Sequence, residues 1–112
     1  MVRILFDSGA TGSFIDKQHT KRLRVRNTTQ NIWQTGNGKV STCKKVKTHL
    51  ILPELYHERV IEHDFNVLEH PLGYDVIMGT DLMSSLGINI NFEQGEIQRQ
   101  DAAMPFKSCD AT

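Results

Sequence analysis

The sequence predicts a small all-β domain with one short helix near its C-terminal end, and three observations support this prediction. A short apolar run that contains the β-branched residues Val2 and Ile4 indicates a buried strand. Apolar and polar residues alternate over residues 40–52, which is the period of a strand with one buried face. The segment Gly36-Asn37-Gly38 lies between two β-prone stretches and favours a hairpin turn.

The first strand is followed directly by an acidic turn. Asp7 comes after the apolar run 2–6, and the residues from Ser8 to Gly12 are all small. Small residues let other backbone approach closely, so we expect the Asp7 carboxylate to lie at the tip of the turn among amide and hydroxyl donors. A simpler interpretation stays open, because Asp commonly caps a turn or the helix that follows it.

The stretch 13–23 predicts a short helix or helical turn that buries Phe14, Ile15 and Leu23. This part of the chain is also the most basic, with the cationic residues Lys17, His19, Lys21, Arg22, Arg24 and Arg26. A nucleic-acid patch is one interpretation, but no aromatic residues are interleaved with the cations. A solvated surface is the favoured interpretation.

Residues 27–31 are polar and predict a loop, and residues 32–46 then predict a protruding hairpin with its turn at residues 36–38. The long second strand ends at Pro53, and Lys44 interrupts its alternation. One face of this strand is formed by Val40, Thr42, Val46, Thr48, Leu50 and Leu52. Glycines at the tip would give the mobility that a lid needs, but they suit any tight turn, so an ordinary surface hairpin is the alternative.

Residues 59–68 predict another half-buried strand, with Ile61, Phe65 and Val67 on its inner face. Four histidines lie around this region, namely His49, His57, His63 and His70. Their spacings match no common ligand pattern, so they are interpreted as scattered surface residues. The sequence therefore predicts no metal site and no cofactor.

Residues 74–81 predict a buried strand that ends at Gly79, followed by a helix that Asp81 caps and Gly87 ends. After the helix, Ile88, Ile90 and Phe92 alternate with asparagines and predict a strand. A turn at residues 93–96 then leads to a last strand from residue 97. The chain shows no internal repeat or linker, so we expect one domain over residues 1–112 with its core at about 2–106.

Composition limits the classes of protein that remain. The chain has 112 residues, and its 13 Lys and Arg balance its 13 Asp and Glu, so nucleic acid is an unlikely partner. Two distant cysteines, Cys43 and Cys109, suggest neither a disulfide scaffold nor a metal pair, which predicts an intracellular, cytoplasmic location. No apolar run approaches the length of a membrane span, so we expect no membrane partner.

Two motifs about 70 residues apart, Asp7-Ser8-Gly9-Ala10 and Ile77-Met78-Gly79-Thr80-Asp81, carry a family resemblance. In this order, with a glycine hairpin between them, they resemble the retropepsins, the aspartic proteases of retroviruses and LTR retrotransposons. The predicted strand, turn and strand from residue 88 onward, together with the Pro-containing apolar end Met104-Pro105-Phe106, resemble the C-terminal part of the gypsy-type retrotransposon proteases. The resemblance implies a single-lobe, retropepsin-like closed β-barrel of the acid protease class, with one short C-terminal helix.

The resemblance also implies roles for individual residues. Asp7 would be the catalytic carboxylate, Ser8 would brace the loop against a partner subunit, and Gly9 and Ala10 would complete the turn. The tip of a flap that folds over bound peptide would be formed by Gly36, Asn37 and Gly38. The strand that packs beside the active-site loop would be formed by Ile77, Met78 and Gly79. Thr80 stands where the viral enzymes often have Arg, and Asp81 is interpreted as a helix cap and not as a second catalytic acid.

One carboxylate cannot supply both the general base and the general acid of peptide hydrolysis. The chain holds a single Asp-Ser-Gly, so the resemblance implies a homodimer with a carboxylate pair formed by two copies of Asp7. Its substrate would be an extended peptide of a retroelement polyprotein, cleaved without metal or covalent intermediate. The alternatives are a non-catalytic dimerisation or peptide-binding module on the same fold, or a cellular retropepsin-like domain with a different peptide partner.

The resemblance covers the chain from about Val2 to Phe106 and departs from the family at the N-terminal end. Family members usually carry one or two strands before the catalytic loop, whereas a single five-residue strand is predicted before Asp7 here. We therefore expect the N-terminal strands to be truncated, as in a fragment of a larger polyprotein or a decayed copy.

Overall fold

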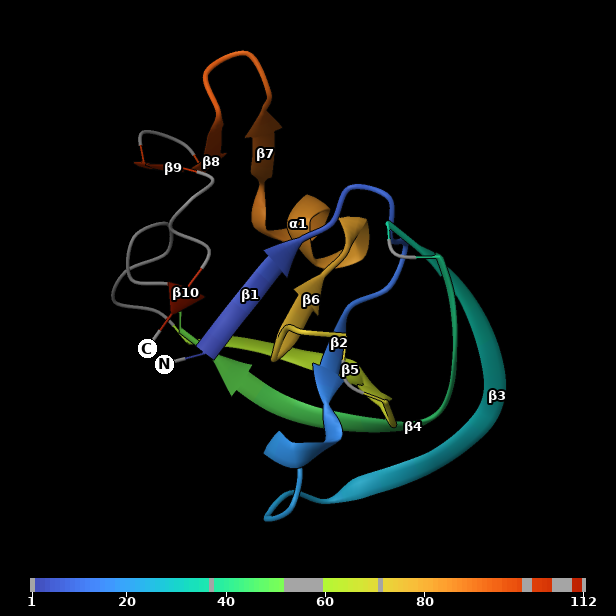
Figure 1. Cartoon of the computed structure of the whole chain (residues 1–112). Coiled ribbons are helices and arrows are strands. Elements are labelled where there is room, and N and C mark those ends of the chain that lie inside the picture. Colours follow the sequence, from blue (N-terminus) through green and yellow to red (C-terminus); the bar gives the residue numbers. More distant parts are fainter. Residues whose placement is uncertain are drawn as a thin grey trace.

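The computed structural model describes residues 2–36, 38–51, 60–70, 72–99, 102–105 and 110–111. These residues form ten strands, one α-helix and one 3₁₀ turn (Figure 1). The strands are β1 (Val2–Phe6), β2 (Phe14–Asp16), β3 (Val25–Thr35), β4 (Gly38–Leu50), β5 (Ile61–Leu68), β6 (Val76–Met78), β7 (Ile88–Asn91), β8 (Glu96–Arg99), β9 (Ala102–Pro105) and β10 (Asp110–Ala111). The 3₁₀ turn η1 spans Lys17–His19 and the helix α1 spans Thr80–Leu86. The predicted all-β class with one short helix is confirmed.

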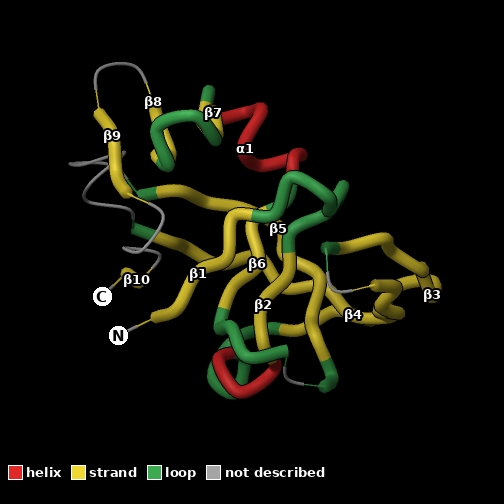
Figure 2. The backbone as a smooth tube through the Cα atoms, turned by 45° about the horizontal axis from the view of Figure 1, so that its top comes forward, coloured by secondary structure: helices red, strands yellow, loops and turns green. Residues whose placement is uncertain are grey.

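The strands form two sheets. The larger sheet has seven strands in the order β10-β1-β6-β2-β5-β4-β3, and the smaller one has the order β7-β8-β9. Near the middle of the larger sheet, β1 runs parallel to β6, and β2 lies between β6 and β5. Figures 1 and 2 show β1, β6 and β2 side by side, with α1 beyond the end of β6. This order places the turn after β1 next to the residues that follow β6.

The alternation in the sequence determines which face of the long strand β4 enters the core. Its even-numbered residues Thr42, Val46 and Leu50 are buried, while odd-numbered residues such as Lys47 and His49 face solvent. The inward-facing residues of β5, Ile61, Phe65 and Val67, are buried as predicted. The predicted positions Leu52, Pro53 and His57 lie outside the described residues.

The short helix or helical turn predicted over residues 13–23 is confirmed as a helical turn at Lys17–His19 and is wrong for residues 14–16. Residues 14–16 form the strand β2, and only the short turn η1 is helical. Phe14 and Ile15 are both buried, as predicted, but they belong to different apolar clusters. Adjacent apolar residues that enter opposite faces of a sheet fit a central strand buried on both sides. The Asp16 carboxylate accepts a hydrogen bond from the Gln18 amide and starts the 3₁₀ turn.

The loop predicted over residues 27–31 is also wrong. The strand β3 continues through these residues, with a shift in register against β4 between Asn27 and Asn31. Since β3 is the edge strand of its sheet, most of its side chains face solvent, and polar residues are tolerated there. Polarity alone therefore did not distinguish an exposed edge strand from a loop.

The C-terminal part contains more strands than the sequence predicts. The turn before β8 is present, with Gly95 at φ 67°, but β8 is followed by β9 and then by β10. The strand β10 pairs antiparallel with β1, joining Val2 to Ala111 and Arg3 to Asp110. Residues 106–109, including Phe106 and Cys109, lie outside the described residues. The helices of the described segments are too short to span a bilayer.

Asp75, just before β6, ties the start of this strand to β1 and η1. Its carboxylate accepts hydrogen bonds from the Arg3 amide at 2.7 Å, the His19 Nε2 at 2.6 Å and the Gln18 side chain at 3.1 Å. The Arg3 amide, then the hydrogen bond and charge of His19, lower the pKa of Asp75 from its usual value near 3.8. Asp75 therefore stabilises the folded state above that value, and this contribution is lost as the pH falls through the lowered pKa.

We expect Asp75→Asn to reduce the free energy of unfolding at pH 7. We also expect this free energy to decrease less in the variant than in the parent chain when the pH is lowered from 5 to 2. Urea unfolding across this pH range, followed by circular dichroism, measures both effects. Glu93→Gln, at an exposed position in the turn between β7 and β8, is the control and should change neither. An Asp75→Asn variant with the same pH dependence as the parent chain would contradict this assignment.

Candidate active site

The turn after β1 is tied at both ends by backbone hydrogen bonds. The Asp7 amide donates to the Met78 carbonyl at 2.9 Å, and the Ala10 amide donates back to the Asp7 carbonyl at 3.1 Å. The first bond continues the parallel pairing of β1 with β6, and the second closes the turn. Asp7 is consequently held in place, with only 7% of its surface exposed.

Both oxygens of the Asp7 carboxylate accept backbone hydrogen bonds. The Gly9 amide donates to Oδ1 at 2.9 Å, and the Gly36 amide donates to Oδ2 at 2.8 Å. The first donor belongs to the same turn, whereas the second belongs to the tip of the β3–β4 hairpin. The carboxylate is therefore oriented by two fixed donors that are far apart in the sequence.

The backbone comes very close to the carboxylate at both donor positions, which favours glycine there. A Cβ atom at Gly36 would lie 3.0 Å from the Asp7 Oδ1, and one at Gly9 would lie 3.2 Å from the same atom. With either contact, the carboxylate or the backbone would have to shift by a few tenths of an ångström. This close approach explains why small residues surround Asp7, as the sequence suggested.

The other predicted residues of the turn have different environments. Ala10 is fully buried, and its carbonyl accepts hydrogen bonds from the Thr80 amide at 2.8 Å and the Thr80 hydroxyl at 3.2 Å. Ser8 faces solvent. Its predicted contact with a partner subunit stays a prediction.

The hairpin of β3 and β4 reaches over the turn that contains Asp7. Thr35 pairs with Gly38, and the Thr35 hydroxyl donates to the Gly38 carbonyl at 2.8 Å. Gly38 has a φ of 104°, which favours glycine in this tight connection. Figure 1 shows the end of β3 beside the loop between β1 and β2. Asn37 lies outside the described residues.

Trp33 anchors the hairpin, a role that the sequence did not reveal. Its ring packs edge-on against Phe14 with 5.8 Å between centroids, and its Nε1 donates to the Thr42 hydroxyl at 2.8 Å. A Cβ atom at Gly12 would lie 2.9 Å from the Trp33 ring, so the indole rests directly on the turn. Trp33 is the chain's single tryptophan, and that was the only signal that could have indicated it.

The strand β6 and the residue after it form the support of the turn. Ile77 and Met78 are fully buried, and Gly79 lies against the carbonyls of Ala10 and Gly12. The structure thus brings together Asp7 and the three residues that the sequence placed beside it, Ile77, Met78 and Gly79.

The predicted helix cap is wrong. Gly79 is the N-cap of α1 and makes no side-chain capping bond, while Asp81 lies in the first turn of the helix. The Asp81 Oδ1 accepts from the Ser13 hydroxyl at 2.7 Å, and its Oδ2 lies 3.2 Å from the His63 Nε2. The predicted end of the helix is confirmed, because Gly87 adopts the left-handed conformation at φ 70°. Ser13 was not singled out from the sequence.

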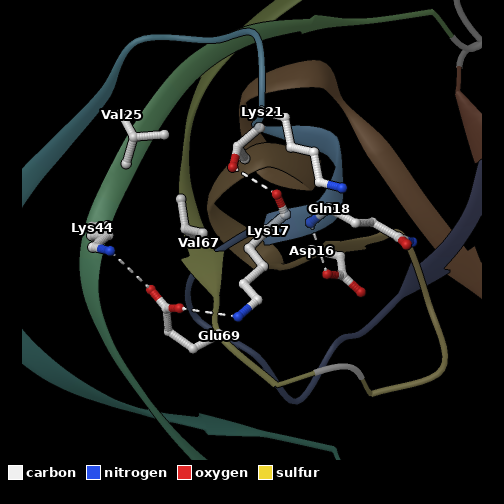
Figure 3. A pocket seen from close by; sticks show the side chains of 9 residues that line it. Asp16, Lys17, Gln18, Lys21, Val25, Lys44, Val67 and Glu69 are labelled. Atoms are coloured by element: carbon white, nitrogen blue, oxygen red, sulfur yellow. Dashed lines mark hydrogen bonds and ion pairs between the residues drawn. The ribbon is translucent and has the colours of Figure 1, made fainter.

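The hollows lined by described residues include two of similar size. One of about 590 Å³ is lined by residues of β4 and by residues 68–70 and 72, with the apolar residues Val40, Leu68 and Leu72 in its wall. The other, of about 650 Å³, is lined mostly by polar side chains, and Figure 3 shows Glu69 between Lys17 and Lys44. Neither is lined by Asp7. Within the described segments, no group of His, Cys, Asp and Glu side chains is suited to hold a metal ion.

Comparisons with known proteins agree with this arrangement. The sequence model of the family described as aspartyl protease matches residues 1–90. The fold is similar to the crystal structure of the retroviral protease-like domain of Ddi1 from Leishmania major, with a TM-score of 0.65 and 23% identity. That match covers 93% of this chain and 84% of the Ddi1 domain. A search of curated proteins finds no match.

Proposed function

Because the chain belongs to the aspartyl protease family, we propose that it is an aspartic endopeptidase in which Asp7 is the catalytic carboxylate. The observation that carries this proposal is the environment of Asp7. This acid is 7% exposed, yet it is oriented by amides from its own turn and from a hairpin tip. An acid that only capped a turn would not need a donor from the distant hairpin.

The active species we propose is a homodimer. The hydrogen bonds that the Asp7 carboxylate accepts come from two amides, and no second carboxylate is among its partners in the described part of the chain. Peptide hydrolysis needs an ionised carboxylate to take a proton from water and a protonated one to give a proton to the carbonyl oxygen. Two copies of Asp7 that face each other would share one proton and fill both roles.

The remaining predicted residues then have supporting roles. Gly9 and Ala10 hold the turn, Gly36 and Gly38 shape the tip of the flap, and Ile77, Met78 and Gly79 form the support. Ser8 and Asn37 keep their predicted roles, at the subunit contact and in the flap. The water attacks the peptide directly, so this chemistry requires no metal and no covalent intermediate.

The substrate we propose is an extended peptide bound beneath the hairpin, within the polyprotein of a gypsy-type LTR retrotransposon. The strands β3 and β4 present backbone groups at the hairpin tip, and an extended chain can pair with such groups. The apolar wall of Val40, Leu68 and Leu72 would receive a side chain of the peptide. The hairpin tip must lift for the peptide to enter, because the Gly36 amide donates a hydrogen bond to the Asp7 Oδ2 and covers the carboxylate.

The same hydrogen bond favours a second candidate, a peptide-binding or dimerisation module without catalysis. A hairpin tip that stays bonded to Asp7 would exclude water from the carboxylate. In that case the chain would bind an extended peptide without cleaving it. The two candidates differ in one measurable outcome, the release of peptide fragments.

Cleavage of an unfolded protein such as reduced casein at mildly acidic pH tests the proposal, with and without pepstatin. Cleavage that pepstatin blocks supports the endopeptidase. Binding of casein peptides without cleavage at any protein concentration would instead establish the second candidate.

The dimer makes a separate prediction about concentration. We expect the specific activity to fall on dilution, with the rate approaching second order in chain concentration below the dissociation constant of the dimer. Sedimentation at the same concentrations should show dimer dissociating in parallel. Full activity from a chain shown to be monomeric would overturn the two-subunit mechanism.

A further inference from the structure

Ser13 lies at the far end of the turn that contains Asp7, and both its hydroxyl and its carbonyl make hydrogen bonds. It is fully buried, and its hydroxyl donates to the Asp81 Oδ1 at 2.7 Å while accepting from the Gly79 amide at 2.9 Å. Its carbonyl accepts from the Asn66 amide at 3.0 Å and from the Asn66 side chain at 3.1 Å. One serine therefore joins the turn to β5, to the end of β6 and to α1.

The segment from Asp7 to Ser13 is thus fixed at both ends and in the middle. The Asp7 amide bonds to Met78 at one end, the Ala10 carbonyl accepts from Thr80 in the middle, and Ser13 bonds to Gly79 and Asp81 at the other end. The residues between these points are small, so they have no bulky side chains that could hold the turn. Its shape therefore depends on the hydrogen bonds to β6 and α1.

The Asp81 carboxylate is itself held in one orientation. Its Oδ1 also accepts from the Leu82 amide at 2.7 Å, and its Oδ2 lies 3.2 Å from the His63 Nε2. The His63 ring packs edge-on against Phe65, with 5.0 Å between the centroids. The hydrogen bonds therefore run from the buried Ser13 through Asp81 to a ring that packs against the core.

We propose that Ser13 and Asp81 are positioning residues for the Asp7 carboxylate, with His63 as the outer support of Asp81. The inference rests on the proposed endopeptidase function. If Ser13 is lost, the far end of the turn is released, and the Gly9 amide can no longer hold Asp7 in a single orientation. A displacement of a reacting group by about 1 Å can lower a rate by about 100-fold.

Kinetic measurements distinguish this role from ordinary stabilisation. Ser13→Ala should lower kcat by about 10- to 100-fold with KM changed by less than about twofold, because the substrate-binding hairpin is not altered. Asp81→Ala should do the same, whereas Asp81→Asn should retain most of the activity because its amide oxygen can still accept from Ser13. His63→Phe should have a smaller effect in the same direction. All variants are compared well below their unfolding temperatures.

Ser85→Ala is the matched control. The Ser85 hydroxyl donates to the Leu82 carbonyl at 3.1 Å on the same helix, and Ser85 faces solvent. The control therefore removes a hydroxyl from α1 and leaves the hydrogen bonds of Ser13 and Asp81 in place. We expect its kcat and KM to equal those of the parent chain.

A second measurement is independent of catalysis. The Gly9 amide bonds to Asp7 and is not a partner of Ser13, so its hydrogen exchange reports the order of the turn. We expect exchange at Gly9 to be at least about tenfold faster in Ser13→Ala and Asp81→Ala, and unchanged in Ser85→Ala and Asp81→Asn. A parent chain that cleaves nothing would refute the proposed function, while exchange at Gly9 would still decide the positioning role.

Unchanged exchange at Gly9 in the Ser13→Ala and Asp81→Ala variants would overturn the inference, even if their unfolding temperatures fell. An equal loss of kcat in Asp81→Asn and Asp81→Ala would also overturn it. If Ser13→Ala fails to fold, Asp81→Ala and His63→Phe provide the test, because both leave the buried serine intact. In that case, exchange at Gly9 that is the same in His63→Phe as in the parent chain would count against the proposal.

Discussion

Asp7→Asn is expected to abolish peptide cleavage while leaving the fold in place. The amide of Asn cannot act as a general base, and in a homodimer the substitution removes both carboxylates at once. General acid and base groups each contribute about 10²- to 10⁴-fold, so we expect the rate to fall at least about 10³-fold. The measurement is the initial rate of peptide release at protein concentrations where the specific activity of the parent chain is at its maximum.

The structure adds a stability cost to this prediction. Both Asp7 oxygens accept amide hydrogen bonds, and Asn can supply only one oxygen. Its NH₂ group must therefore face either the Gly9 or the Gly36 amide, which we expect to cost about 1–3 kcal/mol. Thermal unfolding followed by circular dichroism should show a folded variant with a lowered midpoint.

Asp16→Asn is the control for the loss of activity. Asp16 is also a buried carboxylate, with 6% of its surface exposed, and its Oδ1 accepts a hydrogen bond from the Gln18 amide at 3.2 Å. Its replacement should change stability slightly and leave cleavage intact. If Asp7→Asn cleaves as fast as the parent chain, or if Asp16→Asn is equally inactive, Asp7 is not the catalytic acid.

Local sequence could predict those parts of the site whose conformation depends on neighbouring residues in the chain. The apolar run before Asp7 and the glycines at the hairpin tip each indicated their own conformation without reference to the rest of the chain. The family resemblance then supplied which of these segments meet. The bond from the Gly36 amide to the Asp7 Oδ2 could not be predicted, because it depends on how far the hairpin bends toward the turn.

The incorrect predictions share a physical cause. Local patterns indicated a short helix or helical turn at residues 13–23 and a loop at residues 27–31, and sheet pairing overrode the first at residues 14–16 and the second throughout. Phe14 and Ile15 gain more from burial on opposite faces of a central strand than from one face of a short helix. Asp81 was assigned to a cap by its position, but the buried hydroxyl of Ser13 gives its carboxylate a tertiary partner.

Among Gly→Ala substitutions at the described glycines, Gly79→Ala is expected to lower the free energy of unfolding the most. A Cβ atom there would lie 2.1 Å from the Gly12 carbonyl oxygen and 2.8 Å from the Ala10 carbonyl oxygen. Both are backbone atoms of the turn that holds Asp7, so no side-chain rotation can relieve the contact. We expect a loss of about 3 kcal/mol or more, the upper end of the cost of overpacking.

Gly95→Ala separates steric overlap from backbone strain. Gly95 has a φ of 67° and nothing within 4 Å of its would-be Cβ, so its replacement should cost only about 1–2 kcal/mol. Gly79 has an ordinary φ of −91°, so its whole cost comes from the overlap with the turn. Urea unfolding of the two variants measures the difference. Because β6 and the turn would separate in Gly79→Ala, faster hydrogen exchange should appear first at the Asp7 and Thr80 amides. If the two variants lose equal amounts of stability, the turn can move away from β6 at little cost and the prediction is wrong.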